Sequence, residues 1–219
     1  MSLPSVSIPT FILLAALIAA VCALRLWRPG TPFARLLMTW VLASAAVEFI
    51  GVAGNRFGFV NVRFYNAFIL VEFLLLLRIA MLRPVAGLLR PPYVYVVMAA
   101  FALVWAFDVY TIGMEVKFAA LAFLIGTPVI VAVYLLQLWH LVNTHRDKLS
   151  DHAPFWVYLT VLIFYGTVAP ILGSVNYFRQ FEPQLGRQLI TLVSFMSIVK
   201  FLLLAIACLR ERRHPALPI

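Results

Sequence analysis

Hydrophobic residues are concentrated in seven long runs along the chain, and short segments rich in proline, glycine and charged residues separate the runs. A helix needs about 20 largely apolar residues to cross the hydrocarbon core of a bilayer. The runs therefore predict seven transmembrane helices, at roughly residues 8–26, 34–54, 63–82, 92–109, 117–140, 154–174 and 187–209. No segment between them is long enough for a soluble domain. The expected fold is all-α, with a single seven-helix transmembrane domain over residues 1–219.

The composition agrees with this pattern. Of the 219 residues, 64% are hydrophobic and 11% are charged, whereas about a quarter of a soluble domain is charged. The formal net charge is +9, but the basic residues lie mostly in the short joins, where they orient the helices and meet anionic lipid. We therefore expect the lipid bilayer as a partner, and no nucleic acid. Both cysteines lie near the inner ends of predicted spans, where a disulfide is not expected, and two thiols alone do not complete a metal site. The sequence therefore predicts no disulfide and no metal, and no cofactor is expected.

The distribution of lysine and arginine predicts the orientation of the helices. Eleven of these residues lie at the joins and tail of one side, and five lie at the joins of the other side. Basic residues favour the cytoplasmic side, so the N-terminus is expected outside and the C-terminus in the cytoplasm. The first basic residue, Arg25, follows the first apolar run, which is unlike a signal peptide. The sequence thus predicts a multi-pass membrane protein.

Three ionisable residues lie well inside the predicted spans: Glu48, Glu72 and Lys200. An ionisable group at such a depth normally faces the interior of the bundle, has a partner and marks a functional site. At 1.5 Å per residue, Glu48 lies about 10 Å and Glu72 about 13 Å below the outer surface. The two carboxyl groups are therefore expected at similar depth on consecutive, antiparallel helices.

Other polar residues share the faces of these glutamates. On the second and third spans they recur at spacings of four or seven residues, which place them on one side of a helix. Together with the lysine of the seventh span, they predict a polar pocket that opens outward between helices 2, 3 and 7. The predicted ligand-binding residues are Ser44, Glu48, Asn55, Tyr65, Asn66, Glu72 and Lys200. The alternative is that the two carboxyl groups are protonated or hydrogen-bonded contacts that only hold the helices together.

Lys200 has two interpretations. Helical side chains lean toward the N-terminus of their helix, here outward, so the amine can approach Glu72 and form a buried ion pair. Alternatively, the side chain extends to the cytoplasmic side. Two carboxyl groups and one amine also suggest that one carboxyl group is protonated. A lysine in the last of seven spans is the plan of a microbial rhodopsin, but Met196 replaces that family's aspartate and the sixth span lacks its retinal-binding aromatic residues. The retinal interpretation is therefore disfavoured.

Four stretches resemble a family of small seven-span integral membrane proteins of Bacteroidota: VEFIGVAGNRFG, NVRFYNAFILVEFLLLL, HAPFWVYLTVLIFYG and MSIVKFLLLAIACLR. The resemblance runs along most of the chain. The residues that match the family pattern are Glu48, Tyr65, Asn66, Glu72, Phe155, Trp156 and Tyr165. Lys200 departs from it, because the family's last helix is apolar or aromatic at that position. The resemblance implies the seven-helix fold, the pair of glutamates and a location in the bacterial cytoplasmic (inner) membrane, and it implies no activity.

Three kinds of function fit these features. The first is a sensory, signalling or accessory protein that binds a small molecule or lipid and acts through a cytoplasmic or membrane protein partner, because its joins hold no output domain. The second is an intramembrane lipid-modifying enzyme in which Glu48 and Glu72 divide the acid and base roles. The third is a proton-coupled carrier, although no internal repeat is evident. The sequence leaves open whether the protein is an enzyme.

Overall fold

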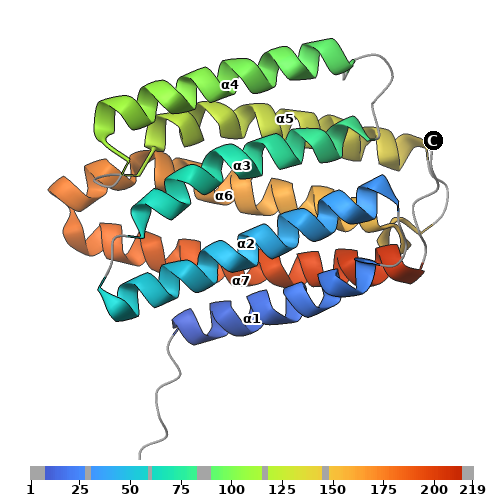
Figure 1. Ribbon diagram of the computed structural model, residues 1–219, viewed down its shortest axis with the longest axis horizontal. Helices are drawn as coiled ribbons and strands as arrows, with labels where there is room; N and C mark the ends of the chain where they lie inside the picture. The colour runs from blue at the N-terminus through green and yellow to red at the C-terminus, as the bar shows by residue number, and fades with distance from the viewer. Residues whose placement is uncertain are drawn as a thin grey trace, which may run out of the picture.

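The computed structural model describes residues 8–27, 31–58, 61–82, 90–114, 118–144 and 148–213. Over these residues the chain forms seven long α-helices and two single-turn 3-10 helices, and no β-strand (Figure 1). The α-helices are α1 (Ile8–Leu24), α2 (Pro32–Phe57), α3 (Val62–Met81), α4 (Pro91–Ile112), α5 (Ala120–Thr144), α6 (Ala153–Phe181) and α7 (Pro183–Arg213). All seven are long and apolar enough to cross a membrane. The predicted all-α, multi-pass architecture is confirmed.

The bounds of the helices follow from local sequence signals. At the start of α2, the side-chain oxygen of Thr31 accepts a hydrogen bond from the backbone N–H of Ala34 at 3.1 Å, and Pro32 takes the first helical position. Such a cap satisfies an amide that has no partner inside the helix. At the other end of α2, Gly58 has a φ of 75°, a left-handed conformation that favours glycine.

The connection between α6 and α7 differs from the prediction. The stretch FEPQLGR at residues 181–187 predicted a join, but α6 ends at Phe181 and α7 begins at Pro183, so that only Glu182 lies outside a helix. Proline suits the first position of a helix, where its missing N–H costs nothing and its φ is already helical. The 31 residues of α7 span about 46 Å, which exceeds the roughly 30 Å hydrocarbon core of a bilayer.

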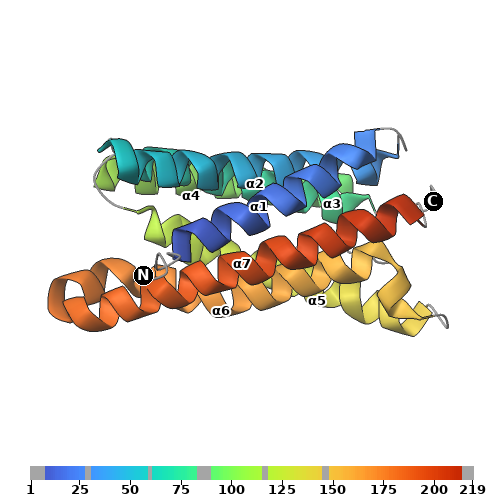
Figure 2. The same ribbon diagram turned by 90° about the horizontal axis from the view of Figure 1, so that it is seen from below.

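The helices form a closed ring. Each helix packs against its neighbours in the sequence, and α1 packs against α7 to complete the circle, as Figures 1 and 2 show from two sides. Inside the ring α3 also contacts α5, and α2 also contacts α7. The face that α1 buries consists of Ile12 and four small residues, Ala15, Ala16, Ala19 and Ala23. Small side chains let helix backbones approach closely in a membrane, where packing rather than water drives association.

Side chains from two other helices cap the start of α5 by accepting hydrogen bonds from its backbone. The backbone N–H of Ala119 donates to Asn66 Oδ1 at 2.9 Å, and that of Ala122 donates to Asp108 Oδ2 at 2.8 Å. The first amides of a helix have no partner within it, and a bilayer core offers no water to replace one. Asp108 lies near the end of a predicted span, where an acidic residue is ordinary, but it is 3% exposed and joins α4 to α5.

Candidate functional site

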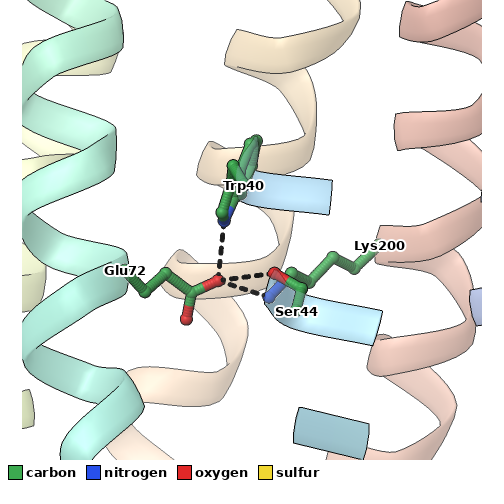
Figure 3. Close-up of polar contacts among 4 residues, drawn as sticks. All are labelled: Trp40, Ser44, Glu72 and Lys200. Atoms are coloured by element: carbon green, nitrogen blue, oxygen red, sulfur yellow. Dashed lines mark hydrogen bonds and ion pairs between the residues drawn. The ribbon is translucent and has the colours of Figure 1, made fainter. Parts of the chain in front are cut away.

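The centre of the bundle holds a carboxylate with three donors. Oε1 of Glu72 accepts hydrogen bonds from Lys200 Nζ at 2.6 Å and Trp40 Nε1 at 2.9 Å, and a longer one from Ser44 Oγ at 3.5 Å (Figure 3). The donors come from α7 and α2, while the carboxylate comes from α3. All three bonds end on the same oxygen, and the second oxygen points away from these donors (Figure 3). The site therefore ties three helices of the ring together.

The ion pair between Lys200 and Glu72 is almost wholly removed from solvent. The exposed fractions of the two side chains are 7% and 11%. Burying each charge costs several kcal/mol, which only a close partner and further hydrogen bonds offset. The pair at 2.6 Å and the donors from α2 provide this compensation. The predicted ion pair is confirmed, and the amine does not extend to the cytoplasmic side.

Aromatic rings surround the ammonium group of Lys200. Its Nζ lies 4.7 Å from the ring centre of Phe164, 5.7 Å from that of Trp40 and 6.0 Å from that of Phe68. A cation within about 6 Å of a ring face is attracted by the negative charge of the π system, and more strongly where water is excluded. The rings therefore add to the stabilisation of a charge that the bilayer alone would strongly disfavour.

Glu48 occupies a different environment on the same side of α2. Its Oε2 accepts a hydrogen bond from the Tyr65 hydroxyl at 3.2 Å, and its carboxyl group also interacts with Ser197 and with the charge of Lys200. Glu48 is only partly buried, whereas Glu72 is buried. One turn further along α2, a β-carbon at Gly51 would collide with the Tyr65 hydroxyl, so glycine leaves the space that this hydroxyl needs.

The structure brings together most, but not all, of the predicted ligand-binding residues. Five of them form one polar cluster around the two glutamates: Ser44, Glu48, Tyr65, Glu72 and Lys200. Tyr65 shares a helix stripe with Glu72 but bonds to Glu48. Asn66 is outside the cluster, because its amide donates to the carbonyl of Met114 at 2.9 Å and caps α5. The side chain of Asn55 lies outside the described part of the structure.

Sequence reasoning missed the aromatic residues of the site. Trp40 had a usable signal, since it lies four residues before Ser44 and eight before Glu48 and therefore on the same face of α2. Phe164, from α6, had none. Its place beside Lys200 depends on how the ring closes, and neither spacing nor composition specifies that.

In the described part of the chain, histidine, cysteine and acidic residues do not gather in groups of three that could hold a metal ion. No family model, curated protein or solved structure matches the chain. The resemblance to the seven-span proteins of Bacteroidota therefore stays a prediction.

Proposed function

We propose that the protein binds a lipid or a similar small amphiphile at Glu48, from the predicted outer side of the bacterial cytoplasmic membrane, and signals through a protein partner. The observation that carries this proposal is that the two carboxyl groups are held unequally. Lys200, Trp40 and Ser44 all engage Glu72, whereas hydroxyl groups hold the less buried Glu48. Two carboxyl groups and one ammonium group also mean that the cluster is neutral only when one carboxyl group carries a proton.

The chemistry of Glu48 defines the head of the ligand. A carboxylate accepts hydrogen bonds and attracts positive charge, so the ligand offers an ammonium or hydroxyl group. A cationic head would take the place of that proton and keep the cluster neutral, because an excess charge is costly in a medium of low dielectric constant. A ligand with only acceptor groups could not take the place of the proton.

An apolar groove supports a lipid as the ligand. It runs along the seam of α1 and α7 with a volume of about 760 Å³, which is within the range of small-molecule sites. Gln188 and Thr191 line its predicted outer end, and aliphatic and aromatic side chains line the remainder. This order matches the head and tail of a lipid in the outer leaflet. On α7, Ser197 interacts with Glu48 and the next residue, Ile198, lines the groove, so the same turn of α7 contributes to both.

The seventh helix provides a route from the site to the predicted inner face. Eleven residues after Lys200, or about 16 Å along the helix, Glu211 is fully buried and accepts a hydrogen bond from Thr31 at 3.1 Å. A ligand that favours one position of α7 over another would shift the population of this inner contact. A cytoplasmic or membrane protein partner would then detect the change.

Native mass spectrometry of the gently purified protein tests the proposal. The wild type, Glu48→Gln and the matched control Asp151→Asn would be compared. Asp151 is a suitable control because it is a carboxylate of the inner end, with 44% of its side chain exposed. We expect a bound lipid or amine in the wild type and in the control, and its loss in Glu48→Gln.

Other results would contradict the proposal. Equal binding to Glu48→Gln and wild type would mean that the carboxyl group does not hold the ligand. If the wild-type protein carries no bound mass in any spectrum, it does not retain a ligand through purification, and the proposal fails. A mass adduct fixed on Lys200 by borohydride would replace the proposal with a Schiff-base chemistry.

A second candidate function is an intramembrane enzyme that modifies lipids. The different environments of Glu48 and Glu72 favour this function as well, because two such carboxyl groups can divide the roles of acid and base. Glu48 is the group that could exchange a proton with a substrate, while Glu72 is engaged in the ion pair with Lys200. Expression of wild type and of Glu48→Gln, followed by lipid profiling of the membranes, tests this function. Identical profiles would argue against it.

A further inference from the structure

A buried hydroxyl group in the bundle lacks a partner. The Tyr165 side chain of α6 is 5% exposed, and its hydroxyl oxygen forms no hydrogen bond with the described residues. A buried polar group without a partner loses its hydration and gains nothing in return, so native structures nearly always satisfy it with protein or with water. The Tyr165 hydroxyl faces the Glu72 carboxylate at the edge of hydrogen-bonding range, where the two groups interact, but the geometry falls short of a direct hydrogen bond.

A small cavity lies next to this tyrosine. Its volume is about 20 Å³, and residues of α3, α4, α5 and α6 surround it. The side chains of Tyr165, Glu72 and Thr127 form the polar part of its wall, and apolar side chains such as Phe73 and Ile130 form the rest. A cavity needs roughly 10–15 Å³ and two to four polar partners to hold one water molecule. This cavity meets both conditions.

We propose that the cavity binds one ordered water molecule, which bridges Tyr165 of α6 to Glu72 of α3. The water accepts a hydrogen bond from the Tyr165 hydroxyl and donates one to Oε2 of Glu72, the oxygen that the other donors do not use. Its second proton is directed at the oxygen of Thr127, whose own hydrogen is donated to the carbonyl of Phe123 at 2.7 Å. Three hydrogen bonds are typical of a buried water molecule.

The water site extends the charged cluster across the ring. Without it, the direct hydrogen bonds to Glu72 from the described residues come from α2 and α7. With it, each carboxylate oxygen has a donor, and α5 and α6 are joined to the same group. The site is distinct from the one proposed for the ligand, because Glu48 and Ser197 do not line this cavity.

A double-mutant cycle in thermal denaturation tests the proposal. Tyr165→Phe would be measured in the wild type and in Ala122→Val, which fills the cavity from the wall that α5 provides. We expect Tyr165→Phe to lower the denaturation midpoint of the wild type by a few degrees and to leave that of Ala122→Val unchanged or raised. In the second background the water has already been expelled, so the phenylalanine only removes an unsatisfied hydroxyl.

Tyr134→Phe is the matched control. This tyrosine is equally buried, but its hydroxyl donates directly to the carbonyl of Leu76 at 2.9 Å. Its loss should lower the midpoint by the same amount in both backgrounds. If Tyr165→Phe behaves like this control, Tyr165 bonds directly to Glu72 and the proposal is wrong. If Tyr165→Phe raises the midpoint of the wild type, the cavity is dry, and the proposal is equally wrong.

A crystal structure at about 2 Å resolution gives a second, independent measurement. We expect an electron-density peak within about 2.7–3.0 Å of both the Tyr165 hydroxyl and Oε2 of Glu72. An empty cavity, or a direct bond between the two side chains, would overturn the proposal.

Discussion

Replacement of Lys200 by methionine is the most direct test of the buried ion pair. Methionine keeps most of the length and apolar volume of the lysine side chain but removes its charge. Glu72 would then keep its hydrogen bonds from Trp40 and Ser44 and lose the one group that balances its charge.

The expected effect is large. Removal of one partner from a buried ion pair typically costs about 3–5 kcal/mol, because the remaining charge is left uncompensated. In a chain of this length each kcal/mol lowers the denaturation midpoint by about 2–4 °C, so Lys200→Met should lose roughly 6–20 °C. Glu72→Gln should lose a similar amount, since it leaves the ammonium group without its carboxylate.

The double variant separates the ion pair from simple loss of packing. With both charges removed, no uncompensated charge remains in the bundle, and apolar replacements of whole ion pairs are often neutral or stabilising. Lys200→Met/Glu72→Gln should therefore be more stable than either single variant. Denaturation can be followed by tryptophan fluorescence in detergent, with the exposed Lys148→Met as a control within about 0.5 kcal/mol of wild type. Wild-type midpoints for both single variants, or a double variant as unstable as the sum of the two, would refute the reasoning.

The same denaturation assay checks three further contacts. Asp108→Ala should lose about 1–2 kcal/mol, because it uncaps the start of α5; an unchanged midpoint would mean that this cap contributes nothing. Trp40→Phe should cost about 1.5–3 kcal/mol through loss of a hydrogen bond to a charged group, and stability equal to wild type would contradict the bond. Gly126→Ala should lose about 1–3 kcal/mol, because its β-carbon would collide with the ring of Phe101. Gly166→Ala, which meets open space, is the matched control, and equal effects of the two would disprove the collision.

The number and place of the helices could be predicted because the bilayer imposes them. A span must be long enough to cross the hydrocarbon core, and every backbone group within it must be paired internally. The same physics predicted the ion pair. A lone charge such as Lys200 is too costly in the bundle without a partner, and Glu72 is the carboxyl group at a suitable depth.

The surroundings of the pair could not be predicted in the same way. The ring of Phe164 comes from α6, whose position around Lys200 depends on the closure of the whole ring. Phe68 did have a signal, because it lies four residues before Glu72 on the same face of α3. Periodicity shows which face of a helix is buried but does not show what that face meets. Asp108 is a related case, because an acidic residue near the end of a span is normally exposed, and only the approach of α5 gives it a buried partner.

The separation of Glu72 and Lys200 in the chain has a consequence for synthesis. The two residues are 128 positions apart, so the third helix enters the membrane well before the seventh has been translated. At about 5–20 residues per second, the interval is roughly 6–26 seconds. During that time Glu72 lies in the bilayer without its ammonium partner, which is a costly environment for a carboxyl group. The arrival of the last helix supplies that partner, so that ring closure and formation of the ion pair become a single late step of assembly.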